Sequence, residues 1–159
     1  MKNIAFAIMM IMSMAISAPS HANLTFDVYE DINRMAVLGT PSGQYNAAIS
    51  LIKTTENYSA AALWLQKSAD QGYPHAQAVL GSLYSSGLGV KPDVVKGYAL
   101  VIVSMPRIEQ GVLLKTVFIL RDDLEQMMSQ IQLDKANVMI SCWRKTRAKP
   151  EVAKHCFTY

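Results

Sequence analysis

The sequence is poor in charge of either sign, in aromatic residues and in cysteine. Charged residues make up 17% of the chain and aromatic residues 8%, and only two of the 159 residues are cysteines. The formal net charge of +3 gives no basis for nucleic-acid binding, which requires a concentrated positive surface. Apolar residues make up 51%, far above what a disordered chain carries. We therefore expect a single folded domain.

The first 22 residues predict a secretory signal peptide. They begin with one positive charge at Lys2, continue with an apolar run over residues 4–16, and end with small residues at Ser20 and Ala22. A membrane anchor is the alternative, but it needs about 20 apolar residues, and Pro19 closes the run before that length. No later stretch is long and apolar enough to span a membrane. We expect cleavage after Ala22 and a periplasmic or secreted mature protein.

Strand signals are nearly absent after the signal, and the apolar residues follow a helical period. Gly72 is suited to end one helix in the left-handed conformation, and Pro74 to start the next. Asp93 can cap a further helix, and Ser129 with Gln132 fits a capping box for the last one. The chain is therefore predicted to be all-α and built from short antiparallel helix pairs.

One helical pattern occurs twice. Residues 61–68 read Ala-x-x-Trp-x-x-x-Ser, and residues 97–104 read Gly-x-x-Leu-x-x-x-Ser, at an offset of 36 residues. A helix pair that recurs at this period is typical of tetratricopeptide-like solenoids, in which each unit buries a face by stacking on its neighbours. The repetition therefore predicts a short α/α solenoid.

The longest motif extends over two neighbouring segments. Residues 61–72 carry Ala-x-x-Trp-x-x-Lys-Ser-Ala-Asp-Gln-Gly, and residues 76–93 carry Ala-Gln, Leu-Gly, Tyr and Gly-x-Gly-Val in that order. Together they resemble the Sel-one-like repeat, a tetratricopeptide-related family, most closely over about residues 60–100. The positions that carry the resemblance are Ala61, Trp64, Gly72, Ala76, Leu80, Gly81, Tyr84, Gly87 and Gly89.

The resemblance implies a domain over residues 23–148 with terminal helices that close the array. Residues 121–143 look like such terminal helices. The second unit departs from the family pattern because Leu100 stands where a large aromatic is expected. A short array with a small binding surface is implied.

The residues of the repeat also have physical roles that do not depend on the family. Paired helices approach closely at small residues, which are expected at Ala61, Ala69, Ala76 and Gly81. Larger core side chains are expected to fill the space between the helices at Trp64, Leu80 and Tyr84. Backbone turns that a Cβ would forbid are expected at Gly87 and Gly89.

Motifs that carry chemistry are missing. The segment 87–90, Gly-Leu-Gly-Val, lacks the Lys-Ser/Thr and third glycine of nucleotide-binding loops, so we interpret it as a turn. His75 has no acidic or cysteine neighbour and is expected on the solvent side. Cys142, His155 and Cys156 match no common zinc spacing. The sequence thus predicts no enzyme activity, no metal and no cofactor.

Cys142 and Cys156 are predicted to form a disulfide. They are the only cysteines and both lie in the part expected to be exported, where an even pair is normally bridged. Pro150 should break the last helix and let residues 151–156 fold back beside it. The bridge would tether the C-terminal tail, residues 149–159, to the end of the array.

Positive charge is concentrated at the C-terminus. Residues 23–143 have a formal charge of −2, and residues 144–159 have +4. These cations can serve as solvated charges at a helix end, favoured by the helix dipole. They can also form a weak contact with an anionic surface such as lipid head groups or a wall polymer.

The sequence as a whole indicates an interaction protein. We expect a non-catalytic scaffold module of the bacterial cell envelope or secreted fraction, with a protein or peptide partner. Its candidate exposed contact positions are Gln66, Asp70 and Lys96. The resemblance leaves an alternative, a cell-wall-related member of the family that binds or hydrolyses β-lactam or peptidoglycan fragments. Attachment to a membrane surface through the basic tail is a third hypothesis.

Overall fold

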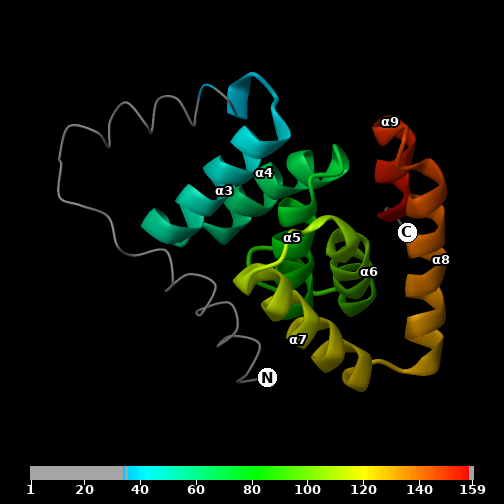
Figure 1. Ribbon diagram of the computed structural model, residues 1–159. Helices are drawn as coiled ribbons and strands as arrows, with labels where there is room; N and C mark the ends of the chain where they lie inside the picture. The colour runs from blue at the N-terminus through cyan, green and yellow to red at the C-terminus, as the bar shows by residue number, and fades with distance from the viewer. Residues whose placement is uncertain (1–33, 35, 158–159) are drawn as a thin grey trace.

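The computed structural model describes residues 34 and 36–157 (Figure 1). Helices with short connections make up this part of the chain, and it contains no β-strand. The predicted all-α class is therefore confirmed. The predicted signal peptide, residues 1–22, and its cleavage site lie outside the described residues, as do the last two residues of the predicted tail.

The helices pack mainly on their neighbours in the chain. Contacts join α3 to α4, α4 to α5, α5 to α6 and α6 to α7, and α8 packs along α6. Figure 1 shows α3 and α4 at one end, α8 at the other, and α5 and α6 between them. The elements are α3 (Pro41–Thr55), α4 (Tyr58–Asp70), α5 (Pro74–Ser86), α6 (Val94–Ser104), the 3₁₀ helix η1 (Met105–Arg107), α7 (Val112–Met127), α8 (Gln130–Thr146), α9 (Pro150–Ala153) and the 3₁₀ helix η2 (Lys154–Phe157).

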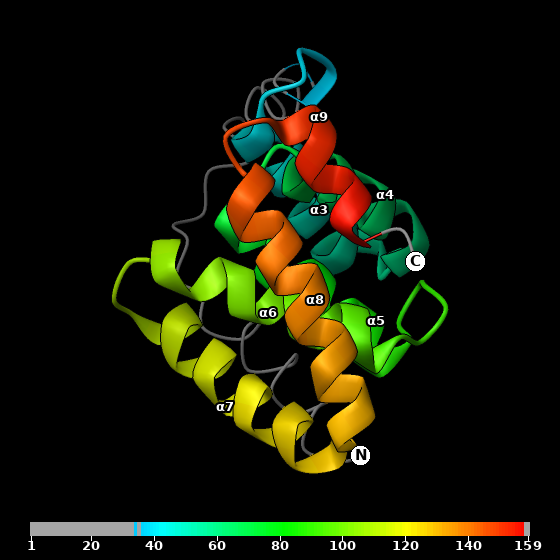
Figure 2. The same cartoon turned by 90° about the vertical axis from the view of Figure 1, so that its right-hand side faces the viewer.

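The end of the chain returns to its middle. α8 ends at Thr146, and α9 begins at Pro150, a residue type that is favoured at the first position of a helix. α9 and η2 contact α8, and α9 also contacts α4 (Figure 2). The segment predicted as a basic tail is thus folded, up to residue 157. It packs against α8, which directly precedes it, and against α4, which lies far earlier in the chain.

Side chains cap the starts of α3, α4, α6 and α8, and the last three of these caps are regularly spaced. Asn57, Asp93 and Ser129 each accept a hydrogen bond from the backbone N–H three residues later, at the starts of α4, α6 and α8. Successive caps are 36 residues apart. The predicted cap at Asp93 and the predicted capping box of Ser129 with Gln132 are both confirmed. The starts of these three helices are therefore evenly spaced along the chain.

Two turns share the same arrangement, in which a glycine with positive φ is followed two residues later by a proline. Gly39 and Gly72 have φ values of +81° and +80°, which side chains rarely tolerate. Each is followed two residues later by a proline, Pro41 or Pro74, that begins a helix. The sequence predicted this turn at Gly72 and Pro74. Positive φ ends one helical segment, and the fixed φ of proline starts the next.

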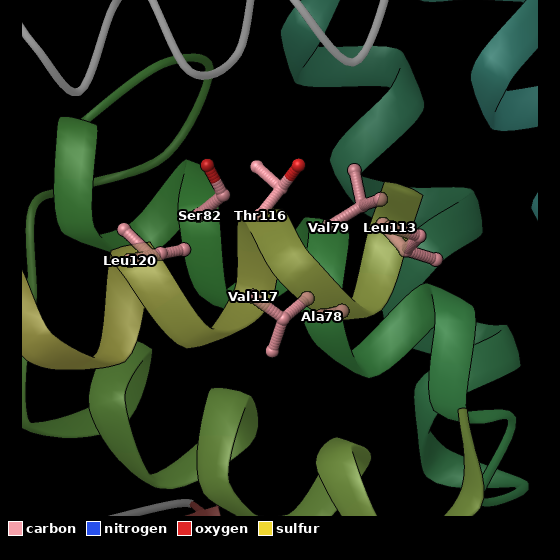
Figure 3. Close-up of a pocket in the computed structure, with 7 residues that line it drawn as sticks. All are labelled: Ala78, Val79, Ser82, Leu113, Thr116, Val117 and Leu120. Atoms are coloured by element: carbon pink, nitrogen blue, oxygen red, sulfur yellow. The ribbon is translucent and has the colours of Figure 1, made fainter. Parts of the chain in front are cut away.

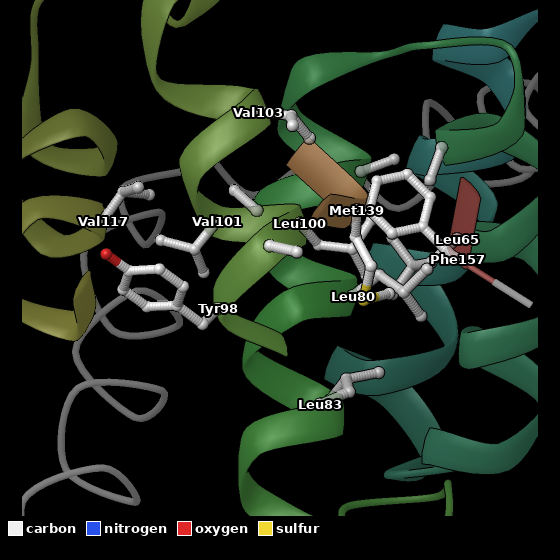
Figure 4. Packing of buried hydrophobic residues seen from close by; sticks show 14 of the residues in the cluster. Leu65, Leu80, Leu83, Tyr98, Leu100, Val101, Val103, Val117, Met139 and Phe157 are labelled. Atoms are coloured by element: carbon white, nitrogen blue, oxygen red, sulfur yellow. The ribbon is translucent and has the colours of Figure 1, made fainter. Parts of the chain in front are cut away.

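Leucines fill the centre of the molecule (Figure 4). Leu65 and Leu80 are fully buried, as expected for apolar faces that meet at a common core. α5 and α6 approach most closely at two glycines, since a Cβ at Gly81 would lie 2.8 Å from the carbonyl oxygen of Gly97. A Cβ at Gly97 would lie 2.2 Å from Ser85 Oγ. Small residues at both positions therefore allow this crossing.

Candidate functional site

α5 separates two surfaces of different chemistry. Successive residues of an α-helix are about 100° apart, so His75, Val79 and Ser82 lie along one side and Tyr84 lies on the opposite side. We call these the open side and the covered side of α5. α3 and α7 border the open side, whereas α4 and α6 pack closely on the rest of the helix.

A chain of polar contacts crosses the covered side. Lys96 Nζ donates a hydrogen bond to the Tyr84 hydroxyl at 2.9 Å and lies 4.3 Å from the centre of the Tyr84 ring. The Tyr84 hydroxyl in turn donates to Gln66 Oε1 at 3.4 Å. Gln66 Nε2 donates to Asp70 Oδ1 at 2.7 Å. We call these four residues the polar cluster.

The polar cluster contains all three contact positions expected from the sequence. Gln66, Asp70 and Lys96 are brought together, but the expectation that they are exposed is wrong, because all three are half-buried. Their polar groups bind one another across α4, α5 and α6. Tyr84 is the link that the sequence did not suggest, since we expected it to serve as packing.

The 3₁₀ helix η2, near the C-terminus, brings positive charge close to the polar cluster. Burial raises the pKa of Asp70, whereas the hydrogen bond from Gln66 and the charges of Lys154, Lys96 and His155 act in the opposite direction. Lys154 and His155 lie on η2. The carboxylate at the end of α4 is therefore balanced in part by cations from the far end of the chain.

Trp64 and Tyr84 occupy the edge of the core, not its centre. Both are partly buried and pack against the buried cluster. Lys67 Nζ lies 4.5 Å from the centre of the Trp64 ring, a cation–π distance. The prediction that these two aromatic residues fill the core is therefore wrong in part, because each also meets a lysine at the surface. Leu65, next to Trp64, is the fully buried side chain of that turn.

The small residues singled out in the sequence lie at close approaches and turns. Ala61 and Ala76 are fully buried, and Ala69 is buried nearly as completely. Gly87 ends α5 in the left-handed conformation. A Cβ at Gly89 would lie 2.3 Å from the carbonyl carbon of Tyr58, so this loop rests directly on the start of α4.

Three rings gather at the start of the open side. The ring centre of Tyr45, from α3, lies 5.4 Å from that of Tyr73 and 5.9 Å from that of His75. The rings of Tyr73 and His75 stack with their centres 5.3 Å apart. The expectation of a solvent-side His75 is wrong in part, because the residue is half-buried and its Nδ1 atom is fully buried. Burial, and secondarily the neighbouring Tyr73, raises the pKa of Tyr45. Sequence reasoning missed this cluster because Tyr45 comes from a different helix.

An apolar depression continues along the open side between α5 and α7 (Figure 3). Its free volume is about 10 Å³, close to the space that one water molecule needs. Small-molecule sites usually measure roughly 300–1,000 Å³, so this depression is too small to enclose such a ligand. The lining residues are Ala78, Val79, Ser82, Leu113, Thr116, Val117 and Leu120.

Arg107 connects the turn before α5 to α8. Its guanidinium donates to the carbonyl oxygen of Gly72 at 2.6 Å and to Gln77 Oε1 at 2.7 Å. It also lies 4.7 Å from the centre of the Trp143 ring. Burial lowers the pKa of Arg107, and the charge of Arg147 acts in the same direction. No local pattern in the sequence predicts this contact, because its partners lie 30 or more residues away.

The structure joins Cys142 to Cys156, as predicted, with the two Sγ atoms 2.01 Å apart. Cys156 is buried and Cys142 is half-exposed. Among the described residues, no group of three or more His, Cys, Asp or Glu side chains could hold a metal ion. In the same part of the chain, no helix combines the length and apolar character needed to cross a bilayer.

No protein-family model matches the chain, and no curated protein or solved structure shows a significant similarity to it. The contacts described above are therefore the basis on which a function can be assigned.

Proposed function

We propose that the protein is a non-catalytic interaction module of the bacterial cell envelope or secreted fraction, and that it binds an extended segment of another protein on the open side of α5. The observation that carries this proposal is the continuous run of aromatic and apolar side chains from α3, α5 and α7 on that side. Protein-binding surfaces are enriched in aromatic residues and need shape but no enclosed cavity.

The proposal includes a short α/α solenoid of antiparallel helix pairs related to the Sel-one-like repeat. The caps at Asn57, Asp93 and Ser129 support it, because they repeat at the spacing of 36 residues seen in the sequence. Ser68 and Ser104, at equivalent positions of α4 and α6, are both fully buried. In such arrays the first helices of successive pairs share one side, which offers an extended surface to a partner.

The location is part of the same proposal. A disulfide fits an oxidising compartment, and the sequence begins with the features of an export signal. We expect the exported protein to begin at Asn23. N-terminal sequencing that finds Met1 would contradict this expectation.

Site-specific photo-crosslinking in intact cells tests the binding surface. A photoreactive residue at Thr116, in the depression, is expected to capture a protein partner, and the same residue at the exposed position Lys135 on α8 is the matched control. Val79→Asp should abolish the adduct formed at Thr116. Equal capture at both positions, or an adduct that survives Val79→Asp, would contradict a partner on the open side.

The non-catalytic part of the proposal has its own test. The purified protein is expected to turn over no ester, peptide, glycoside or β-lactam substrate. Turnover that persists through repurification and disappears with a single substitution would favour the cell-wall alternative. Envelope association that is lost as salt is raised would favour attachment through the basic C-terminus.

A further inference from the structure

The last described residues of the chain are buried against two of its helices, as a bound peptide would be. The C-terminal segment, residues 150–157, consists of α9 and η2 and contacts α4 and α8. Cys156 and Phe157 are 1% and 5% exposed, and Ala153 is buried as well. These residues belong to the same buried cluster as Leu65 and Met139 (Figure 4). The segment thus covers an apolar seat between two helices that precede it in the chain.

Side chains and one covalent bond attach this segment. The backbone hydrogen bonds at its start are local, from Lys149 N–H to the Thr146 carbonyl at 2.7 Å and from Ala153 N–H to the Lys149 carbonyl at 3.0 Å. Farther along, Cys156 is bonded to Cys142 of α8. The segment is therefore held in place by its apolar side chains and by the disulfide.

One carboxylate close to this surface interacts electrostatically with the cations of the segment. Lys154 and His155 are exposed on η2 and act electrostatically on Asp70, at the C-terminal end of α4. Phe157 follows them directly in the sequence. An apolar seat beside a half-buried carboxylate is suited to a segment that carries an aromatic side chain next to cations.

We propose that the surface beneath the C-terminal segment is a second binding surface, for a partner segment with an aromatic residue next to cationic residues, and that the Cys142–Cys156 disulfide keeps it occupied by the chain's own end. This surface lies apart from the open side of α5. A test that rules out this second binding surface would therefore leave the proposed function unchanged.

Opening requires reduction by a dithiol. One thiolate of the dithiol attacks the Sγ atom of Cys142, which is the more exposed sulfur, and Cys156 leaves as a thiolate. The second thiol of the reductant then attacks the mixed disulfide and releases Cys142. Two electrons pass to the protein, the reductant becomes a disulfide, and its two protons end on Cys142 and Cys156. The segment is then free to exchange with a competitor.

Peptide binding tests the surface directly. The receptor is the full chain with Cys156→Ser and Phe157→Asp, which weaken the internal ligand. The probe is a fluorescent peptide with the sequence of residues 149–159 and Ser in place of Cys. We expect it to bind at least tenfold more tightly than the same peptide with Phe157→Asp, and at least tenfold more tightly than it binds the oxidised wild-type chain. Equal binding in either comparison, or no binding to the receptor, would overturn the proposal.

A second measurement uses the wild-type chain and does not depend on the folding of a variant. Trypsin is expected to cleave after Lys154 at least tenfold faster when the disulfide is reduced, because cleavage requires the segment to leave its seat. Cleavage after the exposed Lys135 on α8 is the internal control and should not change. Equal rates at Lys154 in the oxidised and reduced chains would overturn the proposal.

Discussion

His75 and Val79 on the open side of α5 and Tyr84 on the covered side are all half-buried, but the two sides differ in what their polar groups bind. On the covered side, Tyr84 is held by Lys96 and Gln66, so the polar groups are satisfied within the molecule. On the open side, His75 stacks on Tyr73, and its buried Nδ1 has no hydrogen-bond partner among the described residues. Partial burial alone therefore does not identify a binding surface. The open side, where the buried His75 Nδ1 lacks such a partner, is the better candidate.

The difference arises from the neighbours of α5. α6 crosses it at Gly81 and Gly97, where the two backbones nearly touch. α4 packs on it as well, whereas the contact with α7 is limited and leaves a depression. Close packing on one side allows side chains of three helices to reach one another, and loose packing on the other leaves apolar groups at the surface.

The strongest test of this comparison uses two adjacent residues of α5. Leu80→Ala is expected to lower the free energy of unfolding by about 4 kcal/mol, because Leu80 is fully buried and leaves a cavity. Val79→Ala, on the half-buried open side, should cost about 1 kcal/mol or less. Urea denaturation measures both. Similar losses would mean that the open side is as well packed as the core.

The next effect concerns the disulfide that holds the C-terminal segment. Its cysteines are 14 residues apart, and a bridge that closes such a loop adds about 3 kcal/mol by restricting the unfolded chain. Cys156→Ser is therefore expected to lower the melting temperature while leaving the far-UV circular dichroism nearly unchanged. Thiol labelling of the unreduced, denatured protein is the direct control. Two reactive thiols per chain would show that the bridge is not formed.

A smaller difference in stability is expected when a tyrosine hydroxyl is removed from each side. Tyr84→Phe removes the hydroxyl that binds Lys96 and Gln66 and should cost about 1 kcal/mol. Tyr45→Phe keeps the ring that packs on Tyr73 and His75 and should change stability by less than about 0.5 kcal/mol. Chemical denaturation of the two variants is the measurement. A larger loss at Tyr45 would reverse the assignment of polar and apolar sides.

The smallest expected effect is a pH dependence from Asp70. Its pKa is raised in the folded protein, chiefly by burial, so the folded state holds the proton more tightly than the unfolded state does. The contribution of Asp70 to stability must then fall as pH rises from its ordinary pKa of 3.8 through the raised value. Asp70→Asn removes this decline. The unfolding free energies of the wild type and the variant are to be measured between pH 3 and 7. As pH rises, the variant should become increasingly stable relative to the wild type. A difference that does not change with pH would contradict the raised pKa of Asp70.

Prediction from sequence succeeded where the controlling contact is local. Asp93 caps the N–H of Lys96, three residues away, and Ser129 with Gln132 closes a box over the same distance. Gly72 needs only its own φ to end a helical segment. The helical class follows from these signals and from the period of the apolar residues.

Prediction failed where the partner is far away in the chain. His75 was expected in solvent, but Tyr45, 30 residues earlier, brings a ring to it. Asp70 was expected to be exposed, but Lys154, 84 residues later, comes close enough to affect its pKa. No local pattern carries information about either approach.

The sequence by itself determined that the described chain is helical, where several of its helices begin, and that its only two cysteines could pair. Helix periods, caps and turns depend on residues three or four positions apart, which the sequence displays directly. Only the tertiary structure decided which side of α5 is covered and where the C-terminal segment rests. A half-apolar helix can bury either flank, and the choice depends on which distant segments pack against it.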